Sequence, residues 1–365
     1  MAAIMPDPVT IAPHLRLAGR GALSNQTNRF EAAERTVFDD GWDLPWEPRV
    51  VRTEVALERP RTAITRNTSP DLGFDRSVNP YRGCEHGCIY CFARPSHAYL
   101  GLSPGLDFET KLIARPGIAD VLAAELRKKS YRVAPIGIGT NTDPYQPVEA
   151  VHGLMRQVLE VLREFRHPVQ IVTKGTGIER DIDILADMAA MGLAQVGVSV
   201  TTLDDAVSRA MEPRVPRPQR RIETIRRLAA AGIPVRVMVS PVIPALTDHE
   251  LEAILAAGAA AGARAASSIV LRLPREVAGL FREWVEAAFP DRAARIMGRV
   301  RELHGGQDYD PAFGVRMTGQ GVWAALHQKR FAVACRRLGL AREMAPLRCD
   351  LFAVPVRVGE QMRLF

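Results

Sequence analysis

Apolar and polar positions follow two different periods along most of the chain. Six short, β-rich runs are separated by amphipathic segments whose apolar residues recur every three to four positions. Several of these segments end in glycine, which commonly terminates helices. Strands that alternate with helices in this way predict a parallel sheet joined by right-handed crossovers. The expected strands are 77–83, 135–142, 169–175, 195–202, 235–244 and 268–274.

The number of expected strands decides between the architectures that use parallel sheets. Six βα units are too few for a closed eight-stranded barrel, so we expect an α/β fold with a partial (β/α)6 TIM-type barrel over residues 75–290. An open doubly wound sheet is the alternative. Residues 1–74 show no sustained period and predict an irregular N-terminal extension. Residues 291–365 predict a basic, helical C-terminal region that is a candidate lid.

Charge is distributed unevenly over the 365 residues. The chain carries a net charge of +7 at pH 7, and residues 291–365 hold 13 Lys or Arg against 7 Asp or Glu. This balance favours an anionic partner such as nucleic acid. Aromatic residues make up only 6% of the chain, so no platform for base stacking is expected from the composition.

The start of the sequence and its cysteines indicate the compartment. The first residues lack the basic start and apolar run of a signal peptide. The most apolar stretch, 253–263, is too short to cross a bilayer and is flanked by Glu252 and Arg264. The five cysteines do not form the even, spread-out set of a secreted disulfide framework. We therefore expect a cytoplasmic protein with no membrane segment.

Three cysteines form the clearest chemical motif, with the spacing Cys-x3-Cys-x2-Cys. Three thiolates on one loop can ligate three irons of a [4Fe–4S] cluster and leave the fourth iron open to a small molecule. Gly83 and Gly87 give the loop freedom to fold around such a cluster. A zinc site with His86 or His97 as its fourth ligand is the alternative. The expected iron ligands are Cys84, Cys88 and Cys91.

The motif and its surroundings resemble a known family of enzymes. With Tyr90 as the aromatic residue before the third cysteine, the motif resembles the signature of the radical S-adenosylmethionine (SAM) family. The wider sequence is similar to the branch that contains spore photoproduct lyase and its relatives, over roughly residues 75–265. Such families have a partial TIM barrel. The strings that carry the similarity are NPYRGC at 79–84, YCFAR at 90–94, TDPYQPVE at 142–149, TKG at 173–175, SVTTLD at 199–204 and RAMEPR at 209–214.

The resemblance implies a cofactor pair and a reaction. SAM would chelate the open iron, and an electron from a donor such as flavodoxin or ferredoxin would cleave it to a 5′-deoxyadenosyl radical that abstracts hydrogen. The lyase family is said to use a cysteine hydrogen donor on the second barrel strand, where this chain has Thr140 as the nearest equivalent. Cys335 and Cys349 could donate hydrogen from a C-terminal lid, or they could be core thiols.

Polar residues at the carboxyl ends of the strands are the candidates for binding SAM. Lys174 closes the third strand, and the resemblance implies that it pairs with the SAM carboxylate; the alternative is a solvated lysine. Ser199 and Thr201 face one side of the fourth strand and could bind ribose or carboxylate, or simply bond to backbone. The second strand ends in four residues that could hold the methionine ammonium or form a cap or Asx turn. These are Thr140, Asn141, Thr142 and Asp143.

Further candidates surround the motif. Arg209 and Arg214 could contact the SAM carboxylate or the substrate, or form a basic helix surface. The backbone beside Tyr90 is expected to meet the adenine of SAM. Tyr99 and Tyr145 could relay a radical, or they could be packing residues.

Three functional hypotheses remain open at the level of sequence. The first is a radical SAM enzyme that repairs or modifies nucleic acid, which the basic C-terminal region favours. The second is the same chemistry on a protein or a small molecule. The third is a non-catalytic iron–sulfur protein.

Overall fold

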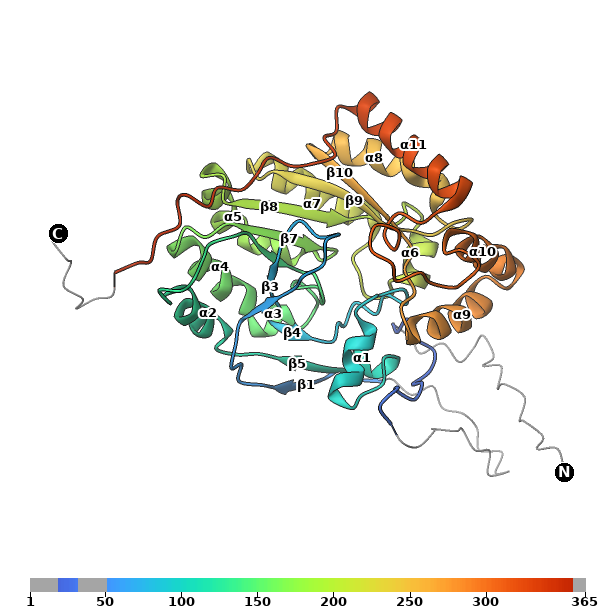
Figure 1. Ribbon diagram of the computed structural model, residues 1–365, viewed down its shortest axis with the longest axis horizontal. Coiled ribbons are helices and arrows are strands. Elements are labelled where there is room, and N and C mark those ends of the chain that lie inside the picture. The colour runs from blue at the N-terminus through green and yellow to red at the C-terminus, as the bar shows by residue number, and fades with distance from the viewer. Residues whose placement is uncertain (1–18, 32–50, 357–365) are drawn as a thin grey trace.

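The computed structural model describes residues 19–31 and 51–356, and predictions that fall on 1–18, 32–50 and 357–365 lie outside the described residues. Its larger sheet has seven strands in the order β10-β9-β8-β7-β6-β3-β2 (Figure 1). All neighbours pair in parallel except the edge strand β2, which is antiparallel to β3. The strands are β2 (Ile64–Arg66), β3 (Arg76–Val78), β6 (Ile136–Ile138), β7 (Val169–Thr173), β8 (Ala194–Ser199), β9 (Val235–Val242) and β10 (Ala265–Val270).

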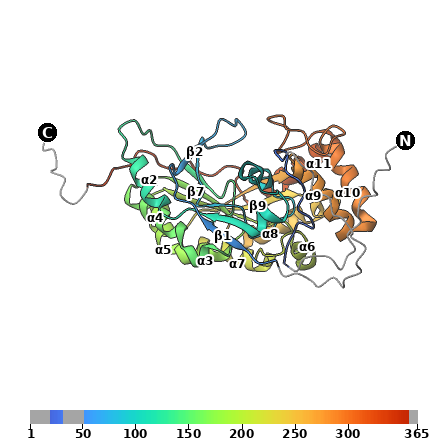
Figure 2. The same cartoon turned by 90° about the horizontal axis from the view of Figure 1, so that it is seen from below.

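The helices between the parallel strands form one continuous layer. Helix α2 contacts α4, α4 contacts α5, and the 3-10 helix η3 (Thr176–Asp181) contacts both α5 and α7. Helix α7 contacts α8, and α8 contacts α11. Figure 2 shows α4, α5 and α7 along one side of the sheet. A single helical layer around six parallel strands confirms the predicted partial barrel rather than a doubly wound sheet. The helices are α2 (Ile118–Leu126), α4 (Leu154–Glu164), α5 (Ile182–Ala190), α7 (Pro218–Ala230), α8 (Leu251–Ala260) and α11 (Gly321–Leu338).

Strand β9 shows how the sequence pattern builds the two faces of the sheet. Val235, Val237 and Val239 are buried against the helical layer, whereas the residues between them are less buried. Successive side chains of a strand point to opposite faces, so the intervening residues line the concave face of the barrel. The main apolar core therefore lies between strands and helices, and the concave face is left for polar side chains.

A smaller sheet carries the cysteine motif. Its order is β1-β5-β4, with β1 (Glu54–Leu57) parallel to β5 (Lys111–Ala114) and β4 (Tyr81–Arg82) antiparallel to β5. The segment before residue 75, which was expected to be irregular, thus supplies β1 and β2. Both strands are short and pair with distant parts of the chain, so they leave no local period in the sequence.

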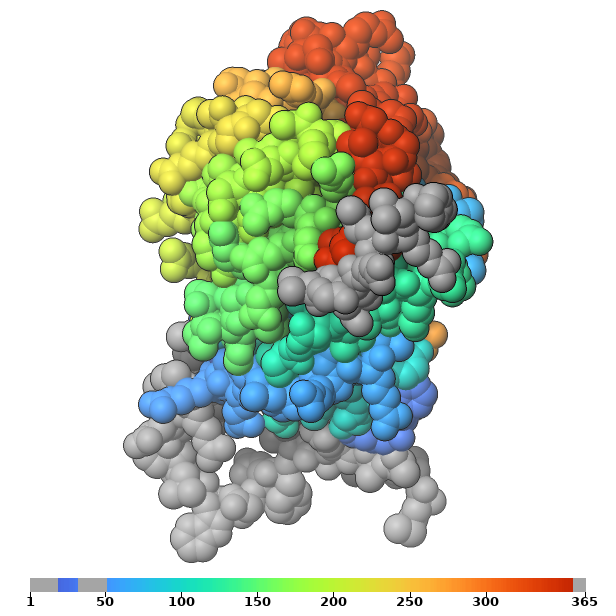
Figure 3. Space-filling model, turned by 90° about the vertical axis from the view of Figure 1, so that its left-hand side faces the viewer, coloured from blue at the N-terminus to red at the C-terminus, as the bar shows by residue number. Residues whose placement is uncertain are grey.

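The C-terminal region has two parts that lie at opposite ends of the barrel. Helices α9 (Glu276–Ala288) and α10 (Pro290–Leu303) share an apolar cluster with the cysteine motif. After α11, the chain runs along the amino ends of the strands. There the Ala341 N–H donates to the backbone carbonyl of Arg264, and the Ala353 N–H donates to that of Phe165. Figure 3 shows this segment beside the green region that contains α4 and α5. A lid over the site stays a prediction.

Two glycines in the middle of helices test the packing of this fold. A Cβ on Gly258 of α8 would lie 2.7 Å from the Val237 Cβ of β9, whereas a Cβ on Gly298 of α10 would meet nothing within 4 Å. Alanine in a helix is more stable than glycine by about 0.5–1 kcal/mol, and overpacking a core costs about 1–3 kcal/mol.

We therefore expect Gly258→Ala to lower the free energy of unfolding and Gly298→Ala to raise it. Urea denaturation of both variants measures the two changes against the parent chain. Equal effects in the two variants would contradict the close approach of α8 to β9.

Candidate active site

The cysteine loop connects β4 to the 3-10 helix η2 (Arg94–Leu100). All three cysteines are free thiols, with Cys84 and Cys88 buried and Cys91 partly buried. Gly83 has φ of 76°, and a Cβ there would lie 2.7–2.9 Å from three neighbouring atoms, so only glycine fits this position. The loop is therefore a tightly packed part of the protein.

A buried ion pair holds one side of the loop. Arg94 and Glu109 are fully buried and in contact. Arg94 also donates to the carbonyl oxygens of Gly87 at 3.3 Å and Cys88 at 3.0 Å. Glu109 in addition accepts the backbone N–H groups of Gly21 and Ala22, each at 2.9 Å. One ion pair thus joins the cysteine loop, α1 (Leu106–Thr110) and the segment that begins at residue 19.

The TDPYQPVE string holds the opposite side of the loop. Gln146 is buried; its amide donates to the Gly83 carbonyl at 3.1 Å and accepts the Glu85 N–H at 2.7 Å. His86 lies 3.4 Å from Asp143. Burial alone would lower the pKa of His86, but the Asp143 carboxylate raises it to about 10. The loop is therefore clamped by an amide and by a buried ion pair.

Asp143 links the loop to the end of β7. Its carboxylate accepts the Thr173 hydroxyl at 2.6 Å, the Lys174 N–H at 2.7 Å and the Tyr145 N–H at 2.9 Å. Burial would raise the pKa of Asp143, but His86 and these donors lower it to about 2. The Asp143 carboxylate is thus fully engaged in hydrogen bonds within the protein. A contact between the backbone carbonyl of Asp143 and SAM stays a prediction.

The RAMEPR string holds the loop through backbone bonds. The Ile89 N–H donates to the carbonyl of Met211 at 3.0 Å, and the Arg214 N–H donates to that of His86 at 3.3 Å. Met211 ends helix α6 (Asp205–Met211). These two bonds therefore fix the position of the cysteine loop relative to the segment that follows β8.

Glu212 in the same string is the centre of a buried network. Its carboxylate accepts the Tyr90 hydroxyl, the Thr201 hydroxyl at 2.8 Å and an Arg221 N–H at 2.8 Å. Burial would raise the pKa of Glu212, but Arg221 and Lys174 lower it. The hydroxyl groups of Tyr90 and Thr201 thus donate to Glu212. Any contact of these two residues with SAM is therefore expected from their backbone atoms.

Lys174 and Ser199 lie together at the ends of β7 and β8. The Lys174 ammonium donates to the Ser199 hydroxyl at 3.2 Å and lies 5.7 Å from the centre of the Tyr90 ring. Burial raises the pKa values of Cys88 and Cys91, and the Lys174 ammonium acts against that rise. Lys174 therefore faces the cysteine loop, and it forms no ion pair with a carboxylate of the described residues.

The other residues expected to bind SAM lie in different surroundings. Thr140 and Asn141 are half-buried after β6, and their side chains make no hydrogen bond within the described residues. Thr142 is buried, and its hydroxyl donates to the Tyr81 carbonyl at 3.1 Å. Thr140 and Asn141 thus offer unused polar groups at a strand end, whereas the Thr142 side chain is already bonded.

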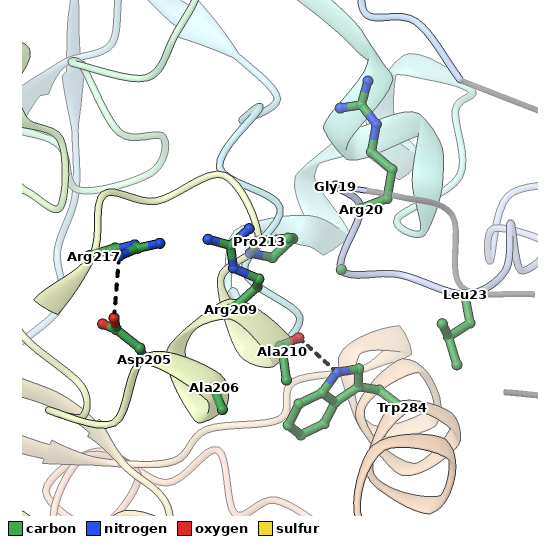
Figure 4. Close-up of a pocket in the computed structure, with 11 residues that line it drawn as sticks. Gly19, Arg20, Leu23, Asp205, Ala206, Arg209, Ala210, Pro213, Arg217 and Trp284 are labelled. Carbon is green, nitrogen blue, oxygen red and sulfur yellow. Dashed lines mark hydrogen bonds and ion pairs between the residues drawn. The ribbon is translucent and has the colours of Figure 1, made fainter. Parts of the chain in front are cut away.

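Arg209 and Arg214 are exposed on the surface around the loop. Arg214 pairs with Glu85 at 2.9 Å. Arg209 lines a pocket of about 630 Å³, in which Figure 4 shows its guanidinium beside that of Arg217. The pockets that contain these arginines include neither Lys174 nor Ser199. A contact of Arg209 or Arg214 with the SAM carboxylate or the substrate stays a prediction.

The two downstream cysteines lie away from the loop. Cys335 is buried near the end of α11, which leads to Ala341 beside the amino end of β10. Cys349 follows Arg348, whose N–H donates to the carbonyl of Gly192 just before β8. The site at the carboxyl ends therefore receives neither thiol, and Cys335 is a core residue.

The donor set of the loop suits a cubane cluster. Three free thiols lie on eight residues of hydrogen-bonded, largely buried backbone, and one lysine faces them. Each thiolate of a [4Fe–4S] cluster binds a different iron. Both histidines considered for zinc have other partners: His86 pairs with Asp143, and the His97 ring bonds to the Lys111 carbonyl at 2.9 Å. No three His, Cys, Asp or Glu side chains of the described residues are arranged around one metal ion.

Comparisons with known proteins agree with this site. Residues 78–257 match the family model described as the radical SAM superfamily. An uncharacterized protein of Mycobacterium tuberculosis is 40% identical over 242 residues, which is 66% of this chain and 70% of that protein. An uncharacterized protein of Methanocaldococcus jannaschii is 25% identical over 173 residues, or 47% of this chain and 62% of that protein.

Solved structures show the same fold. Spore photoproduct lyase complexed with dinucleoside spore photoproduct aligns with a TM-score of 0.58 and 14% identity, over 79% of this chain and 81% of that chain. The fold and the loop thus define a partial-barrel protein of the type that carries a three-cysteine cluster. The chain belongs to the radical SAM superfamily of enzymes, and its fold resembles that of spore photoproduct lyase. Among the described residues, no helix is long and apolar enough to span a membrane.

The Glu212 network leads to a prediction about stability. Glu212 and Arg221 are both fully buried, so Glu212→Gln leaves a buried cation without its counter-charge. Breaking such a pair typically costs about 3–5 kcal/mol, whereas an exposed pair contributes less than about 1 kcal/mol. Chemical denaturation should show the large loss in Glu212→Gln. The matched control is Glu223→Gln, which removes a more exposed partner of Arg226 on α7. A loss no larger than the control's would argue against the network.

Proposed function

We propose that the chain binds a [4Fe–4S] cluster through Cys84, Cys88 and Cys91 and uses it to cleave SAM. The observation that carries the proposal is a rigid loop with three free thiols and a facing lysine. The chemistry supplied by a bound, reduced cluster is one-electron cleavage of SAM to methionine and a 5′-deoxyadenosyl radical, which takes hydrogen from the substrate. The electron comes from an external donor such as flavodoxin or ferredoxin.

The residues around the loop have distinct tasks in this proposal. The Lys174 ammonium pairs with the SAM carboxylate, because it is the cation beside the thiols that has no carboxylate partner in the described chain. Ser199 orients Lys174. Thr140 and Asn141 receive the SAM ammonium, since their side-chain oxygens are unused. Tyr90, fixed by Glu212, sets the backbone that meets adenine.

Nucleic acid is the substrate class that the charge distribution supports best. The net charge is +7, and the described surface beside the loop includes the exposed residues Arg209 and Arg214. A reducing cytoplasm would keep the thiols available for iron. The final hydrogen donor is not one of this chain's cysteines, because Cys335 and Cys349 lie at the amino ends of the strands.

The three cysteines give the first test of this proposal. Anaerobically reconstituted protein should hold about four irons per chain, as a single cubane requires. Replacing Cys84, Cys88 or Cys91 by alanine should abolish the cluster absorbance and most of the iron. The matched control is the double variant Cys335→Ala, Cys349→Ala, which should keep both. Stoichiometric zinc without iron in anaerobically purified protein would refute the cluster.

Lys174 gives the second test. A charge-assisted hydrogen bond contributes about 1.5–3 kcal/mol, so Lys174→Ala should weaken SAM binding by roughly ten- to hundred-fold. Titration of the reduced cluster with SAM, followed by electron paramagnetic resonance, measures the dissociation constant. Iron content should stay at the parent level, because Lys174 is not a ligand. An unchanged dissociation constant would mean that another group holds the SAM carboxylate.

A further inference from the structure

In the part of the chain that the structure describes, exposed aromatic side chains are few, and each one is next to an arginine. Among the described residues, four aromatic side chains are exposed by more than a third of their area. Each has a guanidinium over its ring at 4.6–5.0 Å from the ring centre. The four are Phe30 (59% exposed), Phe92 (46%), Tyr99 (72%) and Phe313 (59%).

One turn connects two of these groups. Residues 271–275 link β10 to α9. In this turn, Arg272 lies over Phe92. Glu276, the first residue of α9, pairs at 2.9 Å with Arg29, which lies over both Phe30 and Tyr99. The rings of Phe30 and Tyr99 are themselves 5.3 Å apart. The turn therefore fixes three exposed rings and their cations in one surface.

The fourth ring is tied to the same surface through Asp71. Arg316, which lies over Phe313, pairs with Asp71 at 2.6 Å. Burial would raise the pKa of Asp71, but the Gly314 N–H and the cations of Arg316 and Arg272 lower it. The Val270 N–H, just before the turn that holds Arg272, donates at 3.1 Å to the carbonyl of Met317, which directly follows Arg316. We call the four rings with Arg29, Arg272, Arg275 and Arg316 the aromatic face.

Arg275 supplies a cation that the protein itself does not use. Its side chain is exposed and has no partner among the described residues. Its backbone has φ of 54°, a conformation that costs an ordinary residue about 1–3 kcal/mol. This strained arginine with a free guanidinium lies in the chain between Arg272, which covers Phe92, and Glu276, which pairs with Arg29. This placement suits the binding of an anion from outside the protein.

The aromatic face lies beside the proposed reaction centre. Phe92 directly follows Cys91, and the turn that holds Arg272 and Arg275 follows the carboxyl end of β10. Ligands of parallel barrels bind at the carboxyl ends of the strands. Exposed aliphatic side chains lie elsewhere, for example on α11 at Val322 and Leu326. The face is therefore aromatic and cationic without being an aliphatic groove of the kind that holds a peptide helix.

We propose that the aromatic face binds single-stranded nucleic acid, with bases stacked on its rings and a phosphate at Arg275. The proposal rests on the function proposed above and specifies its substrate. Rings that carry arginines and alternate with a free cation are the arrangement that binds unpaired bases and backbone together. The bases of a duplex are already stacked on one another and cannot use these rings. The sparse aromatic composition had predicted no stacking platform, but the exposed rings are gathered in one place.

The probe that tests this is a fluorescein-labelled thymidine strand of about 15 nucleotides, with its matched duplex as the comparison. Binding to the reconstituted full chain is followed by fluorescence anisotropy between about 50 and about 200 mM salt. The single strand should bind more tightly than the duplex. The double variant Phe30→Ala, Tyr99→Ala should weaken single-strand binding by about ten-fold or more, while Tyr99→Phe, which keeps the ring, should not.

Arg275→Ala tests the phosphate site. Removing one phosphate contact should reduce the slope of log affinity against log salt by about 0.7. The control is Arg337→Ala, because Arg337 is also exposed and unpaired among the described residues but lies on α11. Iron content and melting temperature confirm that each variant is folded.

Several outcomes would overturn the aromatic face. Equal affinity for duplex and single strand would show that the protein contacts only the phosphate backbone of the nucleic acid and not its bases. Parent-like binding by the double variant would show that the rings do not contact the nucleic acid. Equal effects of Arg275→Ala and Arg337→Ala would show that Arg275 does not bind a phosphate at this site. A parent protein that holds iron and cleaves SAM, yet binds no strand, would refute this proposal and leave the radical chemistry standing. Failure to hold iron would instead refute the proposed function.

Discussion

The buried pair of Arg94 and Glu109 is the interaction on which the site depends. Taking two charges out of water costs several kcal/mol per ion, and their mutual attraction offsets this only when the remaining donors and acceptors are also bonded. Arg94 also donates to backbone carbonyls of the cysteine loop, Gly87 and Cys88, and to those of Pro104 and Gly105 before α1, and Glu109 accepts two backbone N–H groups. The pair thus converts an intrinsically flexible, glycine-containing loop into a fixed support for three thiols.

The strings that surround the cysteine motif mainly build this support. Gln146 and Asp143 hold the loop from the side of β6 and β7, and Glu212 holds Tyr90 from the side of β8. Several side chains that could have bound a cofactor, such as those of Asp143 and Tyr90, are therefore bonded to other groups of the protein. The groups left for a ligand are those whose capacity the fold does not use, namely Lys174, Thr140 and Asn141.

Local signals explain what the sequence could predict. The parallel strands and the cysteine motif were predictable because an apolar run and a ligand spacing are both local patterns. The last strand lies at Ala265–Val270 rather than 268–274, since its alanines are weak strand formers and the following apolar residues belong to a turn. Partners such as Glu109 for Arg94 or Asp143 for His86 could not be predicted, because pairing across the fold leaves no trace in local spacing.

The balance of buried charge explains why one cation remains for SAM. Arg94, Arg221 and His86 each have a carboxylate partner near the loop: Glu109, Glu212 and Asp143 respectively. Lys174 is the exception within the described residues: its ammonium donates to a serine hydroxyl and lies over an aromatic ring, and it forms no ion pair with a carboxylate. Three thiolates and a SAM carboxylate would bring negative charge into the space that Lys174 faces. A fold that had paired Lys174 internally would have to give up that pair when SAM binds, whereas an unpaired lysine is stabilised by the arriving anion.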